Sequence, residues 1–313
     1  METQTIGAIF SKNRKCIVNA DLDGVLSGML LQHFLDWRVV GYSSCCGKPN
    51  DELWLAKDVA NITDCVFVDL PVCVEGLPVI DQHFVAFNEE SVRKFLEQGN
   101  KINPNLIKRR VFSDVNGRSQ YTAKYPFGTV HFILAALENQ NIIDKNVTMD
   151  LAANLGGFDL ADLLFRADRV IGNTNQYTHN CIWWIDWLLS IGGSITKELF
   201  TIARNEFAAR LQRERNVENA LLSFGCAGRD GDCSNLFRNR ALDGLKKYFS
   251  FLGKSLCMEE LPVFPFVDYG KLTGRKIAIN TFNFNFAKEE TEKDSVFSFA
   301  MVSMHALSIT YKN

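Results

Sequence analysis

The stretch that decides the fold is Cys16-Ile-Val-Asn-Ala-Asp-Leu-Asp-Gly24. Its apolar start predicts a buried strand, and its end places two carboxylates where that strand stops. Two later stretches have the same form, namely Cys65-Val-Phe-Val-Asp69 and Pro78-Val-Ile-Asp-Gln-His83. The carboxyl ends of parallel strands share one edge of a sheet, and ligands bind at that edge.

The side chains at these three strand ends are therefore expected to converge on one site: Asp21, Asp23, Asp69, Asp81 and His83. Packed carboxylates repel one another unless cations neutralise them. Carboxylate oxygens together with an imidazole suit magnesium or manganese. The sequence thus predicts a divalent-metal site.

Composition bounds the class of protein. The 313 residues are 47% hydrophobic and 22% charged, which predicts a folded chain of two domains. A net charge of -2 is unlike the strongly basic surface of a general nucleic-acid binder. Nine cysteines without a CxxC pair, and no signal peptide after Met1, predict free thiols and a cytoplasmic protein. The most apolar stretch, 182–189, is too short for a membrane span and is interrupted by Asp186.

The first half of the chain alternates strand and helix patterns, which predicts βαβ units and a parallel sheet. Strands are expected at 16–20, 37–43, 65–69 and 78–81, and helices at 25–36, from 49–51, and at 88–96, 126–139 and 147–172.

The second half begins with a long helical pattern at 195–211 that continues towards 222. Strand patterns follow at 263–267, 276–280, 296–301 and 306–311. The expected architecture is α/β: a parallel-sheet metal-binding domain at 1–192, a connecting helix at 193–222, and a smaller α+β domain at 223–313 that caps the substrate.

The motifs resemble a known family. Asn19-Ala-Asp-Leu-Asp-Gly24 resembles the first motif of the DHH phosphoesterases, Val66-Phe-Val-Asp69 the second, and Asp81-Gln-His83 the name-giving Asp-His-His. Ile102-Asn-Pro-Asn105 and the segment Asp150–Asp159 resemble later motifs of the RecJ-like branch. The matches cover about residues 15–165 in the expected order.

The resemblance implies a manganese-dependent phosphoesterase in which two ions, about 4 Å apart, activate a water and clamp the scissile phosphate. It makes Asp21, Asp23, Asp69 and Asp159 carboxylate ligands, with Asp69 bridging the ions. His83 would orient the water or bind the scissile phosphate. Asp81 is expected to position its neighbours rather than bind metal.

Two positions depart from the family pattern. Asn19 stands where the family has Asp or His, and Gln82 replaces the middle histidine. Both offer only neutral oxygen donors, which are weaker metal ligands than carboxylate or imidazole. The site is therefore expected to hold one ion, to hold two ions weakly, or to have lost catalysis.

Other polar residues are candidates for binding substrate. Ser27, with Gly28, is expected near the start of the first helix, whose N-terminus would favour an anion. Asn103 and Asn105 belong to the Asn-Pro-Asn turn, and Arg109 follows it in the basic run Lys108-Arg-Arg110. Lys271 and Arg275 in the second domain are candidates for holding a terminal phosphate.

Each assignment has a simpler alternative. Asp21 and Asp23 would also serve as turn residues before Gly24. Asp69 would also simply end a strand, and His83 alone would be a structural histidine. Asp162 competes with Asp159 as the fourth ligand unless it lies on a solvated helix face.

The basic and aromatic runs have simpler alternatives as well. The cluster Trp183, Trp184 and Trp187 is interpreted first as core packing and second as a platform for stacking bases. The 108–110 run suits either phosphate contacts or a solvated loop. The arginines and glutamates at 204–218 predict an ion-paired helix surface.

Taken together, the motifs predict a divalent-metal-dependent, exonuclease-like phosphodiesterase that hydrolyses short or single-stranded oligonucleotides or cyclic dinucleotides. The small net charge favours short substrates, because long polymers reward many phosphate contacts. The competing hypothesis is a catalytically degenerate DHH-like protein that binds nucleotide, nucleic acid or a protein partner.

Overall fold

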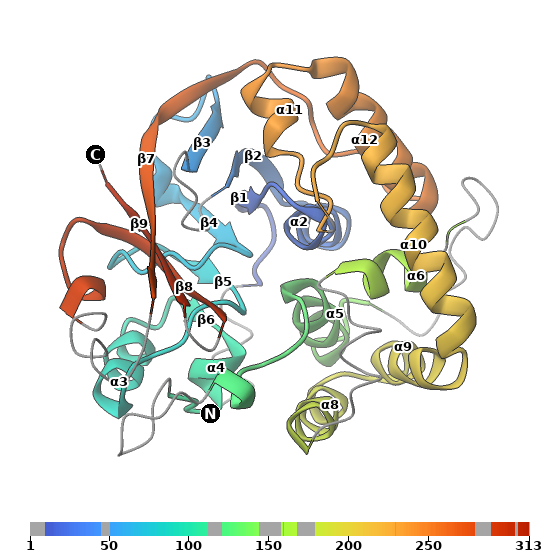
Figure 1. The fold of residues 1–313 in the computed structure, drawn as a ribbon, viewed down its shortest axis with the longest axis horizontal. Helices are drawn as coiled ribbons and strands as arrows, with labels where there is room; N and C mark the ends of the chain where they lie inside the picture. Colours follow the sequence, from blue (N-terminus) through green and yellow to red (C-terminus); the bar gives the residue numbers. More distant parts are fainter. Residues whose placement is uncertain are drawn as a thin grey trace.

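One mixed sheet organises the α/β fold of the computed structural model (Figure 1). The structure describes residues 10–44, 51–111, 121–143, 158, 160–167, 179–228, 230–278, 289–303 and 306–312. Over these residues the sheet has nine strands, in the order β6-β5-β4-β1-β2-β3-β7-β9-β8.

The first five strands in that order are parallel, as predicted, although the sequence pattern did not indicate the short strand at 101–102. They are β1 (Lys15–Asn19), β2 (Arg38–Ser43), β4 (Cys65–Val68), β5 (Val79–Ile80) and β6 (Lys101–Ile102). Helix α2 (Leu22–Leu35) joins β1 to β2, and α3 (Glu89–Glu97) joins β5 to β6. At Gly28 helix α2 lies so close to the sheet that a Cβ atom would come within 2.9 Å of Val18.

The other half of the sheet is antiparallel: β3 (Asp51–Ala56), β7 (Phe266–Ala278), β9 (Ala306–Tyr311) and β8 (Val296–Ser303). The helix expected to start at 49–51 is wrong, since β3 begins at Asp51. Leu53, Trp54 and Leu55 are all buried, as in a strand covered on both faces. Of the strand expected at 263–267 only Phe266 and Val267 belong to β7, and β7 also includes 276–278 of the strand expected at 276–280.

The expected division into a metal-binding domain and a separate capping domain does not match this sheet. Strand β7 pairs directly with β3, so segments from both sides of the predicted connecting helix form one sheet. Strand β8 also reaches back to the chain after β4: Phe299 N donates to Pro71 O (3.1 Å) and Cys73 N to Phe297 O (3.0 Å). The C-terminal strands therefore help to build the edge at which β4 ends.

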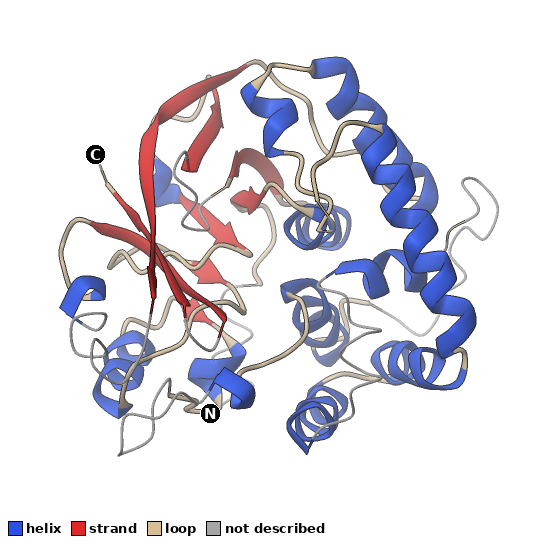
Figure 2. Ribbon diagram, in the orientation of Figure 1, coloured by secondary structure: helices blue, strands red, loops and turns tan. Residues whose placement is uncertain are grey.

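The helices lie mainly to one side of the sheet (Figure 2). Cys16, Val18 and Val39 on that face share one core with α2, α5 and the later helices. On the other face Phe67 packs edge-on against Phe297 of β8, with ring centroids 5.8 Å apart. The remaining helices are α4 (Pro104–Ile107), α5 (Thr129–Asn139), α6 (Leu160–Arg166), α8 (His179–Ile191), α9 (Ser194–Asn205), α10 (Phe207–Ser223), α11 (Ser234–Arg238) and α12 (Leu242–Leu256), with 3-10 turns η1 (Ile62–Asp64) and η2 (Tyr121–Ala123).

The long helical pattern forms two helices, α9 and α10, which meet at Glu206. Their charges do more than pair along a surface. Asp162 of α6 is fully buried and accepts from Arg210 (2.8 Å) and Arg213 (2.7 Å) of α10. Arg166 of α6 pairs in turn with Glu214 (3.2 Å). Asp162 is therefore not on a solvated face; it joins two helices through buried ion pairs, which are costly to break.

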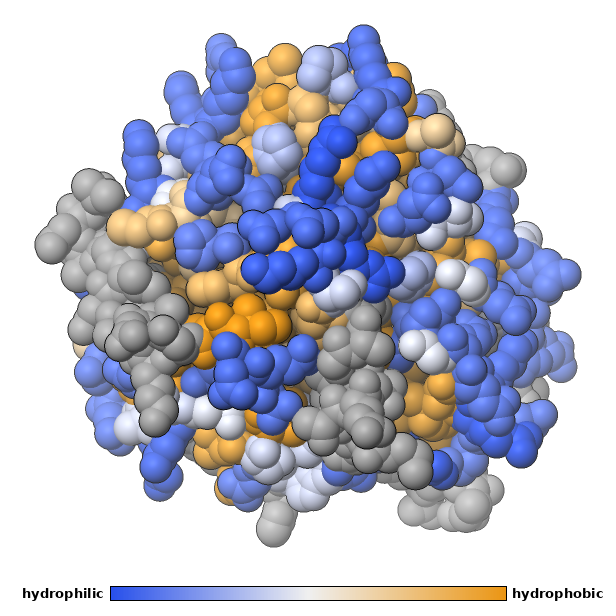
Figure 3. All heavy atoms as spheres, turned by 180° about the vertical axis from the view of Figure 1, so that it is seen from behind, coloured by the Kyte–Doolittle hydropathy of each residue, from blue (hydrophilic) through white to orange (hydrophobic). Residues whose placement is uncertain are grey.

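The described part of the chain contains no helix long and apolar enough to cross a membrane. On the face shown in Figure 3, apolar residues appear as separate patches among hydrophilic side chains.

One buried histidine ties two of these helices together. His131 of α5 has its Nε2 atom 3.0 Å from the carbonyl oxygen of Leu164 in α6, and its Nδ1 atom is buried without a partner. Burial lowers the pKa of His131 from 6.5 to about 4. The folded protein therefore holds this ring neutral at pH values where the unfolded chain protonates it.

We predict that the free energy of unfolding falls as the pH drops from about 6.5 to about 4. The unfolded state binds one more proton in this window, and the lowered pKa corresponds to roughly 3 kcal/mol. Urea titrations of the wild type and His131→Gln between pH 4 and 7 measure this. In the variant, which has no titrating ring at this position, the free energy of unfolding should fall less steeply between these pH values. An unchanged slope in His131→Gln would contradict the assignment.

Candidate metal centre

Asp69 and Asp81 lie side by side because they end neighbouring parallel strands. The ladder continues past the strand ends: Asp69 N donates to Ile80 O (2.8 Å), and Asp81 N donates to Ile102 O (3.0 Å). Asp69 adopts a left-handed backbone with φ of 58°, which aspartate tolerates better than most residues. Both side chains are fully buried.

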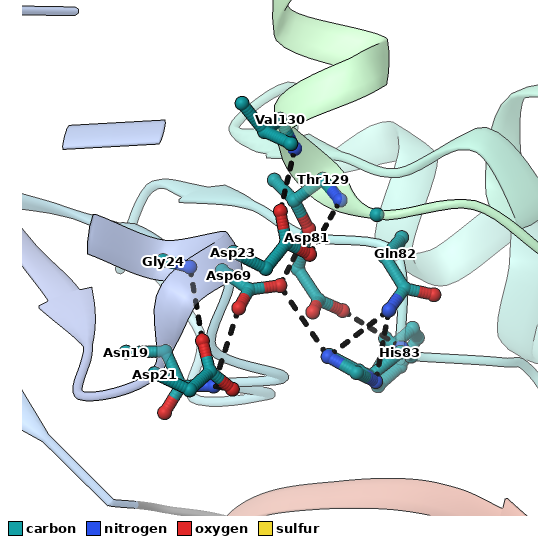
Figure 4. A network of polar contacts seen from close by, with 12 residues as sticks. Asn19, Asp21, Asp23, Gly24, Asp69, Asp81, Gln82, His83, Thr129 and Val130 are labelled. Carbon is teal, nitrogen blue, oxygen red and sulfur yellow. Dashed lines mark hydrogen bonds and ion pairs between the residues drawn. The ribbon is translucent and has the colours of Figure 1, made fainter. Parts of the chain in front are cut away.

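His83 completes a cluster with these two carboxylates (Figure 4). Its Nε2 atom is 3.3 Å from Asp69 Oδ1, and one ligand atom from each of Asp69, Asp81 and His83 lies within 4.8 Å of the others. The His83 side chain is 23% exposed, so the cluster opens to solvent on that side. The arrangement matches the ligand chemistry predicted from the sequence, in a different combination of residues.

One carboxylate oxygen of Asp81 has no hydrogen-bond partner. Its Oδ2 accepts from Phe84 N (2.7 Å) and Asn103 Nδ2 (3.2 Å), but its Oδ1 is buried with no hydrogen-bond partner. The buried ammonium of Lys101 does not serve it, because Lys101 Nζ donates to the carbonyl oxygens of Val74 and Leu77. An unpartnered buried carboxylate oxygen is costly, and a cation would remove that cost. Asp81 is therefore among the residues that could hold an ion, whereas the sequence analysis expected it only to position its neighbours.

Asp21 and Asp23 have structural partners instead. Asp21 caps α2, since its Oδ1 accepts from Gly24 N (3.0 Å), as the turn alternative foresaw. The Asp23 carboxylate accepts hydrogen bonds from Thr129 N and Val130 N, both at 2.8 Å, at the N-terminus of α5. Neither belongs to the described cluster that could hold an ion, so the structure does not bring them to the metal as predicted.

The two residues that depart from the family pattern act as amide neighbours of this cluster. Asn19 Nδ2 lies between two carboxylates, 2.6 Å from Asp21 Oδ2 and 3.2 Å from Asp69 Oδ2. Gln82 Nε2 lies 3.1 and 3.0 Å from the two ring nitrogens of His83. In this arrangement the Asn19 amide links the carboxylates of Asp21 and Asp69.

Thr129 is a functional neighbour that the sequence analysis missed. Its hydroxyl donates to Asp69 Oδ1 (2.7 Å) while its backbone N–H donates to Asp23. The preceding Gly128 leaves room for this, because a Cβ atom there would lie 2.8 Å from the Asp23 carboxylate oxygens. The pair Gly128-Thr129 just before an apolar helix was the only available signal.

Three predicted substrate-binding residues are structural. Ser27 is buried within α2. It does not start the helix, because Asp21 is the N-cap and α2 begins at Leu22. Asn103 caps α4 and holds Asp81. Asn105, also buried, donates to the carbonyl oxygens of Gln82 (2.9 Å) and Phe84 (3.2 Å), so it shapes the turn that carries His83.

The other predicted site residues do not belong to the cluster of Asp69, Asp81 and His83, or are not among the described residues. Arg109 is exposed and 4.0 Å from Glu89. Lys271 pairs through its backbone with Glu52 on β3, and Arg275 lies exposed on β7 opposite Ile309. Asp159, with most of the segment 150–159, lies outside the described residues, so its role as a ligand stays a prediction.

A separate cavity of about 720 Å³ lies between α3 and the start of β8. Phe87, Phe95 and Phe299 form part of its wall, and none of the three cluster residues lines it. The cluster and this cavity are therefore distinct places on the molecule.

Comparison of the chain with protein-family models, curated proteins and solved structures gave no match.

We predict that Asp81→Asn weakens manganese binding by at least about tenfold, because the substitution removes the anionic oxygen that lacks a partner. Asp21→Asn is the matched control, since Asp21 caps a helix and should leave affinity within about twofold. Isothermal titration of each purified variant with MnCl₂ measures both values. A larger loss for Asp21→Asn than for Asp81→Asn would contradict the assignment.

Proposed function

We propose that this protein is a divalent-metal-dependent phosphodiesterase that hydrolyses short or single-stranded oligonucleotides or cyclic dinucleotides. The observation that carries the proposal is the unpartnered Oδ1 of Asp81 beside Asp69 and His83. Two buried carboxylates and an imidazole suit manganese or magnesium better than softer metals. The order of the sequence motifs, which resembles the DHH phosphoesterases, supports phosphodiesters as the substrate class.

A bound ion would lower the pKa of a coordinated water and polarise the phosphoryl oxygen. The side chains around the cluster then have separate tasks. Asp69, Asp81 and His83 would hold the ion, and Asp69 fixes the His83 ring through the 3.3 Å contact at Nε2. Thr129 and Asn19 fix Asp69 in turn. The His83 side chain is 23% exposed, so substrate would approach the ion from that side.

The Asn19 amide supports one ion rather than two. A second ion bridging Asp21 and Asp69 would need their oxygens, yet both accept from Asn19 Nδ2. Removing a carboxylate and an imidazole from the family's ligand set also lowers the affinity of a second position. The proposed centre is thus a single-ion site at the ends of β4 and β5.

We predict manganese-dependent release of nucleotide from labelled oligonucleotides or cyclic dinucleotides, abolished by chelator. Asp69→Ala should lower kcat by at least about 100-fold, because roughly 3 kcal/mol of transition-state stabilisation depends on the ion. Asp36→Ala, an exposed helix end, is the control variant. Undiminished turnover in Asp69→Ala would remove this centre from the reaction.

One observation favours a second function. The Asn19 amide donates hydrogen bonds to both carboxylates without metal, which suits a catalytically degenerate protein that retains binding to nucleotide, nucleic acid or a protein partner. On this alternative the site is held together by amides where an active relative has charged ligands.

The double variant Asn19→Asp, Gln82→His separates the two functions. If the native protein hydrolyses no tested phosphodiester and the double variant gains manganese-dependent activity, the degenerate function is the correct one. Native activity that chelator removes supports the enzyme. The assay is the same nucleotide-release measurement, run on both proteins at matched manganese concentration.

A further inference from the structure

Helix α8 presents an exposed indole next to two buried ones. Trp184 is fully buried and Trp187 nearly so, as core packing predicted. Trp183, by contrast, is 38% exposed, and its neighbour Ile182 is 45% exposed. Trp183 stands edge-on to Trp184, with ring centroids 4.7 Å apart. The buried Trp184 therefore supports one edge of the Trp183 indole, while Trp183 itself stays partly exposed.

Two cations from the basic run gather at this ring. The Arg110 guanidinium carbon is 4.3 Å from the Trp183 ring centroid, and Lys108 Nζ is 5.7 Å from it. Arg110 Nε is buried without a hydrogen-bond partner, and no carboxylate of the described residues pairs with its guanidinium. We call Lys108, Arg110 and Trp183 the Trp183 platform. It offers a flat apolar ring beside the Arg110 guanidinium, which pairs with no carboxylate of the described residues.

The platform and the candidate metal centre share one support. Arg110 N donates to Asn105 O (2.7 Å), and the Asn105 side chain donates to the carbonyl oxygen of Gln82 beside His83. Asn105 Oδ1 accepts from Tyr125 N (2.8 Å), and the Tyr125 ring packs edge-on against Trp184 at 5.1 Å. Asn105 thus fixes the platform's arginine and the histidine turn in one buried frame.

A ligand that satisfies the platform must carry an anion for the arginine and a flat ring for the indole. Single-stranded nucleic acid supplies both, because unpaired bases stack on aromatic rings while phosphates accept from arginine. Arg110 stacked on an indole retains in-plane N–H groups that point away from the ring, and these are the groups that bind phosphate. An ordinary surface arginine, such as Arg93 beside Glu97, has a carboxylate instead.

We propose that the Trp183 platform binds single-stranded nucleic acid, with one base stacked on Trp183 and a neighbouring phosphate at Arg110. The proposal rests on the proposed function, which it deepens by choosing linear single strands over cyclic dinucleotides.

The test is binding of a fluorescein-labelled twelve-nucleotide thymidine strand, measured by anisotropy in EDTA so that no hydrolysis occurs. Trp183→Ala should weaken binding by roughly 5- to 150-fold, the range for loss of one stacked base. Arg110→Gln should weaken it by roughly 10-fold or more, because it removes the charged donor to the phosphate. Trp183→Phe, which keeps a ring, should lose less than Trp183→Ala. Ile182→Ala and Arg93→Ala are the controls and should bind as the wild type does.

A strand of the same length with abasic sites separates stacking from charge alone. Weaker binding of the abasic strand by the wild type, but not by Trp183→Ala, supports the platform. Equal binding of both strands by the wild type, or unchanged affinity in Trp183→Ala, overturns it, and so does wild-type protein that binds neither strand.

The proposed hydrolysis is measured separately, as manganese-dependent release of nucleotide by the wild-type protein. Wild-type binding that needs Trp183, together with no hydrolysis, leaves the platform intact and refutes the phosphodiesterase. Hydrolysis that proceeds while Trp183→Ala binds the thymidine strand as tightly as the wild type refutes the platform alone.

Discussion

Two fully buried carboxylates at the ends of neighbouring parallel strands constrain the rest of this structure. Parallel pairing of β4 with β5 fixes the backbone of Asp69 beside that of Asp81. Buried carboxylates are stable only when donors or cations surround them. Asp69 has such donors in Asn19 and Thr129, whereas one oxygen of Asp81 has none. The unpartnered oxygen of Asp81 is the basis for the cation proposed at this position.

Much of the remaining chain holds this arrangement in place. The C-terminal strands pack Phe299 and Ile309 against Phe84 and Phe87, which fixes the segment that follows His83. Asp23 anchors the N-terminus of α5 and so sets the position of Thr129. Buried ion pairs between α6 and α10, and His131 between α5 and α6, keep that helical layer together. The C-terminal strands and the helical layer thus both support the cluster of Asp69, Asp81 and His83.

The sequence predicted the parallel half of the sheet and the edge where the site lies, because apolar runs that end in acidic residues report strand ends directly. It did not predict which acids meet. Asp21 and Asp23 looked like ligands, but backbone N–H groups that no sequence pattern reveals occupy their oxygens. The capping domain was misjudged for a similar reason: the pairing of β3 with β7 joins residues more than 200 positions apart. Asn103 and Asn105 donate hydrogen bonds to Asp81 and to the turn that carries His83, and their contact with substrate stays a prediction.

The most direct test of the central claim is anomalous diffraction at the manganese edge from crystals grown with MnCl₂. We predict one strong peak within bonding distance, about 2.0–2.3 Å, of carboxylate or imidazole atoms from Asp69, Asp81 and His83. A peak bound by Asp21 and Asp23 instead, or no peak beside Asp81 at saturating manganese, would contradict the account.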